Sequence, residues 1–185
     1  MDALEQESNG GPAVYDIPLL PAPAPGTDVP LAPGDQNMSE KQIRNPDYVS
    51  RVAASLASQP FMHQVLGART GRVAPGEVEI IAEARAELLQ PGGQVHGSVL
   101  AALADSAAGY AAQTLLGPEL DIVTAEFKLN FMAPGFGEHW IARGRVLRAG
   151  RTLSVCSADV FGVLRGKEKL VAHMLTTMMA VPSHD

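Results

Sequence analysis

Residues 97–116 read GSVLAALADSAAGYAAQTLL, and this run decides the fold. It is apolar nearly all round, which predicts a helix that is buried on most of its sides. A membrane span is the alternative for an apolar run of this length. Alanine, rather than Leu or Ile, is the commonest residue of the run, however, and the run holds Asp105 near its middle, where a charge would be costly in lipid. We therefore predict a core helix whose small side chains let other elements approach closely.

The sequence after this helix changes to a period of two residues. Apolar side chains at alternate positions from Val123 to Phe131 predict a half-buried strand. Three more strand-like runs follow, near residues 138–148, 152–164 and 168–181. Gly150 and Gly166 mark the turns between them. Consecutive strands joined by short turns imply an antiparallel sheet.

The sequence before the core helix predicts a shorter helix and two strands. The short helix begins after Asn45, a capping residue, has Pro46 in its first turn, and ends by Pro60. Its apolar face consists of Val52, Ala53 and Leu56. The two strands are expected near residues 63–71 and 77–86, with a Pro-Gly turn between them. All these elements together predict an α+β domain in which an antiparallel sheet wraps one long buried helix.

The 185 residues are enough for one domain, or for one domain and a tail. Residues 1–40 are acidic and rich in proline, and no Lys or Arg precedes Lys41. This composition is typical of a tail without a core of its own, which leaves residues 41–185 as the folded domain. The apolar residues of the tail leave a second option, in which it lies across the folded domain or a partner subunit.

The composition also argues against several classes of function. The net charge of −6 disfavours non-specific binding to nucleic acid, which needs a basic surface. The single cysteine, Cys156, excludes an intramolecular disulfide. The N-terminal residues lack the basic segment and apolar run of a signal peptide, so we expect a cytoplasmic protein without a membrane partner. No CxxC pair or HExxH cluster suggests a metal site.

Asp105 is the first candidate for chemistry because it is the only charged residue in the apolar helix. Burying a carboxylate without a partner is expensive. Such a group is therefore paired, protonated or functional. The sequence leaves two interpretations open: a catalytic role, or a salt bridge to Arg143 or Arg145 from the sheet.

The loop of residues 90–97 leads into the same helix and contains three glycines. The first N–H groups of a helix have no partner within the helix, and the helix dipole there favours negative charge. The N–H of Gly97 is thus a candidate oxyanion-hole donor. The alternative is a tight loop that needs glycine for its turn. His96 orients this loop or contacts the substrate, although a lone histidine is more often structural.

The spacing of Gly97 and Asp105 has a consequence for assembly. Eight residues separate them, which is about 12 Å along a helix axis. A donor and a base that act on one carbonyl must both lie within about 3 Å of the reacting atoms. One copy of the helix cannot supply both groups, whereas two antiparallel copies can. If both residues are catalytic, the active unit is at least a two-fold dimer with sites at the subunit boundary.

The segment 93–98, followed by Asp105 nine residues after His96, resembles the signature of the PaaI-like hotdog thioesterases. The resemblance covers about residues 46–181 and leaves the tail unmatched. It implies the hotdog fold, in which an antiparallel sheet wraps one helix. It also implies dimers with antiparallel helices, often paired into tetramers. The implied reaction is hydrolysis of an acyl-CoA thioester, with coenzyme A as part of the substrate and no further cofactor.

The resemblance assigns roles to four residues around the thioester. Asp105 activates water or attacks the thioester directly, and the Gly97 N–H holds the thioester oxygen. Gln90 helps to position the carbonyl or the water, and Thr124 orients the water. Gln90 stands where PaaI-like members often have asparagine, which leaves the exact position of the carbonyl open.

Arg148, Gly150 and Arg151 resemble a hairpin that contacts coenzyme A, and the two charges suit its phosphates. The alternative for this segment is a solvated turn. Ser98 replaces a usual second glycine and so departs from the family pattern. Two other functions remain open: a hydratase or dehydratase of acyl thioesters on the same fold, and a non-catalytic acyl-CoA-binding module. Aryl and medium-chain acyl groups both fit the pattern.

Overall fold

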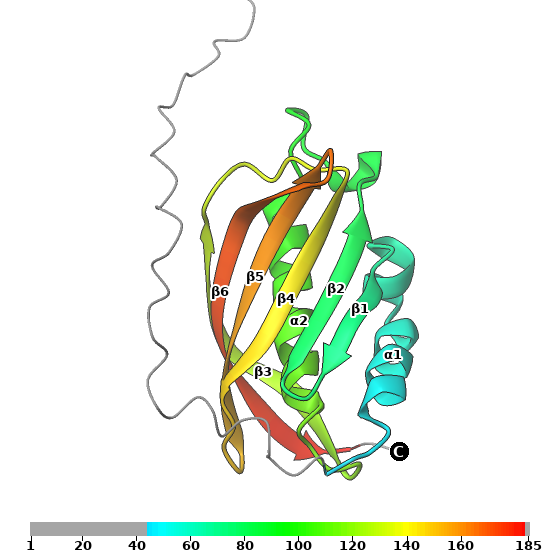
Figure 1. Cartoon of the computed structure of the whole chain (residues 1–185), viewed down its shortest axis with the longest axis vertical. Helices are drawn as coiled ribbons and strands as arrows, with labels where there is room; N and C mark the ends of the chain where they lie inside the picture. The colour runs from blue at the N-terminus through cyan, green and yellow to red at the C-terminus, as the bar shows by residue number, and fades with distance from the viewer. Residues whose placement is uncertain (1–43, 184–185) are drawn as a thin grey trace, which may run out of the picture. The chain divides into compact units, whose positions relative to one another are not determined.

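In the computed structural model, which describes residues 44–183, a six-stranded antiparallel sheet curves around one long helix (Figure 1). The predicted tail of residues 1–40 lies outside the described residues. The elements in chain order are α1 (Tyr48–Ser58), the π-helical turn η2 (Phe61–Val65), β1 (Arg69–Ala74), β2 (Glu77–Glu83), the 3-10 turn η3 (Ala86–Leu88), α2 (Gly97–Gln113), β3 (Leu120–Phe131), β4 (His139–Arg148), β5 (Leu153–Leu164) and β6 (Lys167–Pro182). The predicted α+β architecture, with its sheet wrapped on the core helix, is confirmed.

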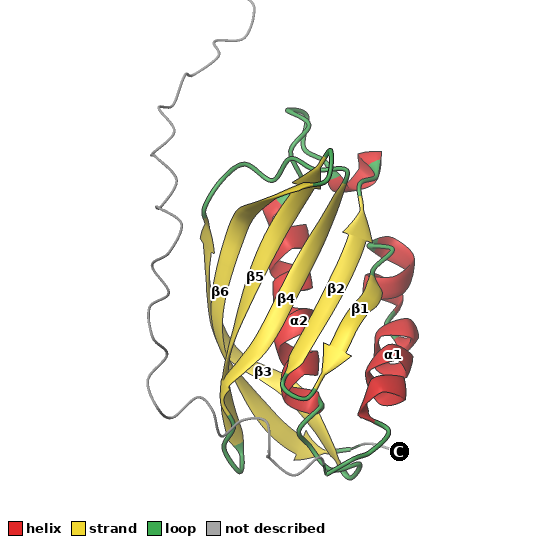
Figure 2. Ribbon diagram, viewed as in Figure 1, coloured by secondary structure: helices red, strands yellow, loops and turns green. Residues whose placement is uncertain are grey.

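The sheet has the order β1-β2-β4-β5-β6-β3, and every neighbouring pair is antiparallel. β4, β5 and β6 follow one another through short hairpins, as the sequence predicts. β3 precedes them in the chain but pairs with β6, so it forms one edge of the sheet. β1 forms the other edge and has α1 beside it (Figure 2).

The helix α2 packs so closely on β4 that one strand position excludes any side chain. A Cβ atom at Gly144 would lie 2.2 Å from the backbone carbonyl atoms of Ala107. Ala104, Ala107, Ala108 and Ala111 of the helix are fully buried. The small side chains of α2 thus let β4 approach closely, as predicted. A larger side chain at Gly144 would push the strand away from the helix.

The N-terminal elements differ in part from the prediction. The cap of α1 is Asp47, and Asn45 instead accepts a hydrogen bond of 3.0 Å from the Asp47 N–H. Val52 and Leu56 are buried as predicted, but Ala53 is exposed. The predicted strand near residues 63–71 is wrong over its first half. Residues 61–65 form the π-helical turn, because Pro60, whose φ is fixed by its ring, takes a helical ψ of −39° and continues the chain into a second helical segment.

The alternation in β3 is interrupted by a bulge that sequence periodicity cannot reveal. Thr124 pairs with Met178 while Glu126 pairs with Thr177, so Ala125 is an extra residue without a partner. The side chains after the bulge therefore change faces relative to those before it. Thr124 and Phe127 both face α2, whereas the prediction placed Thr124 with the polar residues on the opposite face.

Among residues 44–183, no helix has the length and apolar character that crossing a membrane requires. Within the same range, no group of three or more His, Cys, Asp and Glu residues is arranged to hold a metal ion. Cys156 is buried in β5, and burial raises the pKa of its thiol to about 12.

We expect Gly144→Ala to lower the free energy of unfolding by about 1–3 kcal/mol, because overpacking forces the helix and strand apart. Gly109→Ala is the matched control, since a Cβ there meets its neighbours at an ordinary 3.8 Å. Alanine also favours helix over glycine, so this control should unfold at the same denaturant concentration or a higher one. Denaturant unfolding of both variants beside the wild type measures the difference. Equal midpoints for Gly144→Ala and the wild type would contradict the close packing of α2 on β4.

Candidate active site

Asp105 lies in the middle of α2, partly buried, and receives a hydrogen bond from β3. The hydroxyl of Thr124 donates to the carboxylate at 2.8 Å. Burial raises the pKa of Asp105 above its ordinary value, and the Thr124 hydrogen bond acts in the opposite direction. The bulge at Ala125 and the pairing of Thr124 with Met178 hold this hydroxyl over the helix. The structure therefore brings these two predicted site residues together.

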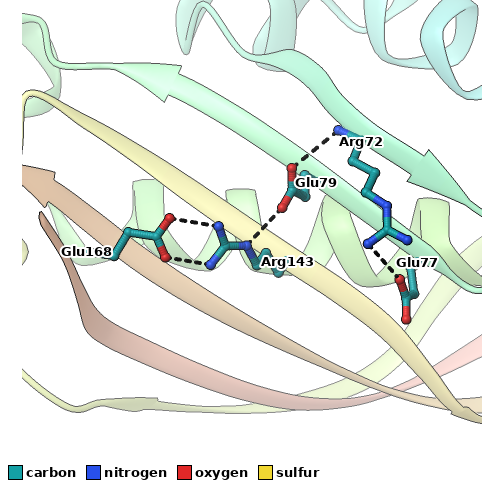
Figure 3. A network of polar contacts seen from close by, with 5 residues as sticks. All are labelled: Arg72, Glu77, Glu79, Arg143 and Glu168. Carbon is teal, nitrogen blue, oxygen red and sulfur yellow. Dashed lines mark hydrogen bonds and ion pairs between the residues drawn. The ribbon is translucent and has the colours of Figure 1, made fainter. Parts of the chain in front are cut away.

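The salt bridge from Asp105 to the sheet, one of the two interpretations that the sequence left open, is not formed. Arg143 lies on the outer face of the sheet, where it binds Glu79 at 2.9 Å and Glu168 at 2.6 Å (Figure 3). Arg145 donates to Ser157 at 3.0 Å. Both arginines alternate along β4 with residues that face α2, so their side chains point away from the helix. Within residues 44–183, Asp105 takes part in no salt bridge, and its functional role stays a prediction.

Asp105 opens into a pocket of about 200 Å³, which we call the carboxylate pocket. Its lining residues are Gln59, Asp105, Ser106, Gly109, Tyr110, Ile122, Thr124 and Met178. Gln59, which ends α1, is a member that the sequence does not indicate. Its position depends on how the N-terminal segment packs beside α2, and no local pattern reports that packing.

The N-terminus of α2 is organised by His96, the residue that caps it. The Nδ1 atom of His96 accepts the Ser98 N–H at 3.2 Å, and its carbonyl accepts the Val99 N–H at 3.0 Å. These bonds fit the orienting role that the sequence left as one option, and contact of His96 with the substrate stays a prediction. They leave the Gly97 N–H between them without an acceptor among residues 44–183. A free donor at the positive end of a helix is suited to bind an anion or a developing oxyanion.

Gly97 lines a second depression, of about 430 Å³, which we call the glycine cleft. Its lining residues are Gln90, Gln94, Val95, Gly97, Leu100, Phe131, Met132, Ala133, Pro134 and Gly135. Gln90 is fixed in the cleft wall, because its side-chain amide donates to the Val95 carbonyl at 3.3 Å. The structure thus brings Gln90 and Gly97 together, as the resemblance implies.

Glycine is required at two positions of this loop, for different physical reasons. Gly93 has a φ of +82°, a conformation that a tight turn requires and other residues avoid. Gly97 is helical, but a Cβ there would lie 2.8 Å from the ring of Phe131. The turn explanation therefore holds for Gly93, whereas Gly97 leaves room for the Phe131 ring on the helix N-terminus.

The glycine cleft and the carboxylate pocket share no lining residue within one chain. Gly97 and Asp105 lie eight residues apart on α2, about 12 Å along its axis. Each chain therefore carries two separate depressions, one with a free N–H donor and one with a carboxylate. Neither depression alone has both groups.

Arg148, Gly150 and Arg151 lie in the predicted hairpin, between β4 and β5, and all three are exposed. Gly150 is required by the turn, because a Cβ would lie 2.2 Å from the Leu153 carbonyl oxygen. The hairpin and the C-terminal end of α2 lie at the same end of the molecule (Figure 1). The hairpin is therefore remote from Gly97 of its own chain.

Comparison with known proteins gives consistent matches. The family model described as thioesterase superfamily matches residues 92–163. A solved thioesterase family protein from Silicibacter pomeroyi is 38% identical with a TM-score of 0.71, and the alignment covers 74% of this chain and 99% of that one. The Escherichia coli PaaI protein, from the phenylacetic acid degradation operon, is 20% identical with a TM-score of 0.65, over 77% and 98% of the two chains, and shares the fold. A curated candidate esterase from Saccharolobus solfataricus is 35% identical over 73 residues, which are 40% of this chain and about half (51%) of that protein.

The raised pKa of Asp105 predicts a cost to stability. A carboxyl whose pKa is higher in the folded than in the unfolded chain destabilises the fold once it ionises. The cost is absent below the unfolded pKa and complete above the folded one. We therefore expect Asp105→Asn to raise the melting temperature at pH 7, with a gain that shrinks as the pH falls to about 4.

Thermal unfolding at pH 7 and pH 4 measures this difference. Glu87→Gln, an exposed change of the same charge, controls for net charge and should not reproduce the gain. A lower melting temperature for Asp105→Asn at pH 7 would mean that the fold stabilises the ionised carboxylate, and would contradict the raised pKa.

Proposed function

The chain belongs to the thioesterase superfamily, and from this premise we propose that it hydrolyses an acyl-CoA thioester to the free acid and coenzyme A. The observation that carries the proposal is the division of the site into two half-sites on one helix. We propose that two chains join these half-sites, so that Gly97 of one chain faces Asp105 of the other. The substrate would be a cytoplasmic acyl-CoA, and the reaction needs no further cofactor.

The first support for a dimer is the uncovered side of α2. Its incompletely buried residues include Gly97, Ser98, Ala101, Ala102, Asp105 and Ser106. They recur at intervals of three to four residues and therefore form one stripe along the helix. The stripe consists of small side chains and includes both candidate catalytic residues. A second helix can approach such a stripe closely.

The second support for a dimer is that one edge strand of the sheet is protected and the other is not. An edge strand has unpaired backbone groups, and natural proteins protect it with charges, short length or a covering element. β1 is short, holds Arg69 and Arg72, and has α1 beside it. β3 spans 12 residues, and its Val123, Phe127 and Phe131 are 42%, 48% and 60% exposed. We infer that β3 pairs with β3 of a second copy, which also covers the uncovered side of α2.

A two-fold axis between antiparallel helices produces two identical sites. The Gly97 N–H of one chain would hold the thioester oxygen, and Gln90 would help to position the carbonyl. Across the boundary, Asp105 would take a proton from water, with Thr124 orienting the water. The water oxygen attacks the carbonyl carbon, the C–S bond breaks, and coenzyme A leaves as the thiol after it gains a proton.

A raised pKa brings the Asp105 carboxylate closer to the working pH at which a base is most effective, and it strengthens the carboxylate as a nucleophile as well. Direct attack by the carboxylate is the second route, and it needs the same ionised residue. Both routes use the Gly97 N–H to stabilise the negative charge that develops on the oxygen.

The hairpin with Arg148, Gly150 and Arg151 would serve the partner's cleft rather than that of its own chain. It lies at the C-terminal end of α2, and antiparallel helices bring this end beside the partner's helix N-terminus. Both arginines are exposed, and neither forms a salt bridge within residues 44–183. They can therefore bind the phosphates of coenzyme A without giving up an existing partner.

Thiol release from a panel of aryl- and alkyl-CoA thioesters tests the proposal. We expect Asp105→Asn to reduce kcat by about a hundredfold or more, because it removes the base and keeps the shape. Gly97→Pro removes the N–H at a helix position that tolerates proline, and should reduce kcat by about 10²–10³. Gly97→Ala retains the N–H and controls for the added Cβ beside Phe131.

Equal losses in Gly97→Pro and Gly97→Ala would contradict the oxyanion role. Wild-type rates in Asp105→Asn would contradict the role of the carboxylate. Tight binding of acyl-CoA without hydrolysis by the wild type would favour a binding module instead.

A further inference from the structure

Asp121, the second residue of β3, lies where the three elements that line the carboxylate pocket are joined. Gln59 at the end of α1, Asp105 on α2 and Thr124 on β3 belong to the lining of that pocket. Asp121 is not among the lining residues, and no step of the proposed hydrolysis uses it. Its contacts therefore bear on how the walls of the pocket are held together.

The Asp121 carboxylate bonds both helices through one oxygen atom. Its Oδ1 accepts a hydrogen bond from the Arg51 guanidinium of α1 at 3.2 Å and another from the Gln113 side-chain amide of α2 at 3.0 Å. Its Oδ2 accepts a longer hydrogen bond, of 3.4 Å, from the Ser183 hydroxyl just beyond β6. Gln113 is buried, and only 17% of the Arg51 side chain is exposed. Hydrogen bonds to an ionised group in such surroundings are stronger than bonds between neutral groups, so Asp121 ties β3 firmly to both helices.

Arg51 extends this anchor to the backbone that leads into β3. Its guanidinium also donates to the carbonyls of Gly117, at 2.9 Å, and Leu120. The planar fork of an arginine can serve several acceptors in fixed directions, which the ammonium group of a lysine cannot. The Leu120 N–H donates to the Gly117 carbonyl at 3.2 Å, so the turn between α2 and β3 is braced internally as well. One side chain of α1 thus fixes the start of β3.

The position of Thr124 depends on this anchor because its stretch of β3 is short and paired on one side only. Within one chain, β3 is an edge strand that pairs with β6. The pairing is regular from Leu120 to Thr124 and is then interrupted by the bulge at Ala125. A bulge disrupts the ladder and bends its strand. Thr124 is therefore held mainly from the start of the strand, where Asp121 lies three residues, or about 10 Å, away.

The Thr124 hydroxyl has two acceptors within reach. It donates to the Asp105 carboxylate at 2.8 Å, and the Sδ atom of Met178 lies 3.6 Å from it. The hydroxyl has one proton to donate, and a thioether sulfur is a weak acceptor. A small displacement of β3 is thus enough to lengthen the bond to Asp105 and leave the hydroxyl with the poorer partner.

We propose that Asp121 is a positioning residue for the carboxylate site: it fixes the start of β3 to both helices and thereby keeps the Thr124 hydroxyl on the Asp105 carboxylate. The inference rests on the proposed hydrolysis, in which Thr124 orients the water that Asp105 activates. Without the anchor, the water loses its orientation and Asp105 loses the hydrogen bond that lowers its pKa. The glycine cleft is not touched by this change, so the effect should appear in kcat rather than in KM.

The test measures kcat, KM and the pKa of Asp105 in Asp121→Asn. We expect kcat to fall about three- to tenfold at pH 7, the worth of one ordinary hydrogen bond, and KM to change by no more than about twofold. NMR titration of the side-chain carboxyl carbons measures the pKa of Asp105, and Asp105→Asn identifies its resonance. Tyr110, the other titratable residue of the pocket lining, has a pKa of about 12 and stays neutral in this range.

We expect the pKa of Asp105 to rise in Asp121→Asn. The loss of a negative charge by itself lowers the pKa of a neighbouring carboxyl, so a rise reports the lost Thr124 hydrogen bond and not the lost charge. Arg51→Lys repeats the test without a change of charge, because lysine keeps the cation and loses the fork. It should move kcat and the pKa of Asp105 in the same directions.

Glu168→Gln is the matched control. Glu168 also pairs with an arginine, Arg143 at 2.6 Å, and its side chain is 37% exposed against 44% for Asp121. It lies on the outer face of the sheet, so its loss should leave kcat and the pKa of Asp105 unchanged (Figure 3).

A pKa of Asp105 that rises in neither Asp121→Asn nor Arg51→Lys would overturn the positioning role, whatever happens to the melting temperature of the two variants. That result would leave the proposed hydrolysis intact. Absence of thiol release from every thioester by the wild type would overturn the proposed hydrolysis instead. The NMR titration would then still decide whether Asp121 positions Thr124, because it needs no turnover.

Discussion

The rigid rise of α2 is the constraint on which the rest of this structure depends. Gly97 and Asp105 lie eight residues apart on one helix, which separates them by about 12 Å along its axis. Rotation of the Asp105 side chain cannot close that separation, because an aspartate side chain is much shorter than it. The helix is fixed in turn by its close contact with β4, where Ala107 meets Gly144. If both groups act on one carbonyl, as we propose, a complete site requires a second copy of the chain.

The separation of Gly97 and Asp105 on α2 gives a common explanation for several other features of the structure. The uncovered stripe of small residues on α2, the long edge strand β3 and its exposed phenylalanines all lie where a second copy would bind. The Asp105 carboxylate, which has no salt-bridge partner within residues 44–183, is also consistent with a functional site. Because burial raises its pKa, we expect its ionisation to cost stability, and proteins retain such groups where activity needs them. The two arginines of the β4–β5 hairpin fit the same arrangement, since they are far from the cleft of their own chain.

The sequence predicts most of the fold because its main elements have strong local patterns. The apolar run of α2 and the alternation in β4–β6 are such patterns, and glycines mark the turns. The π-helical turn at residues 61–65 is not predicted, since a short apolar segment does not distinguish a strand from a helical turn. The bulge at Ala125 is set by pairing with β6, so periodicity within β3 alone predicts the wrong face for Thr124.

The candidate site, like the fold, can be predicted from the sequence only in part. Asp105 and Gly97 can be selected from the sequence because a lone carboxylate in an apolar helix and a glycine at a helix start are local signals. The partners of Arg143 cannot, because Glu79 and Glu168 come from two other strands. Gln59 cannot be predicted as a site residue either, since its place in the pocket depends on the packing of α1. The catalytic roles of Gln90, Gly97, Asp105 and Thr124 remain predictions.

The shared site is tested most directly by mixing two inactive chains. Asp105→Asn and Gly97→Pro are co-expressed with different tags, and the mixed assembly is purified through both. If each site takes Gly97 from one chain and Asp105 from the other, a mixed dimer has one intact site and one site with both changes. The purified mixed dimer should then recover about half of the wild-type thioesterase activity per dimer. Activity no higher than that of the two parent variants would mean that each chain forms its site alone, and would contradict the shared site.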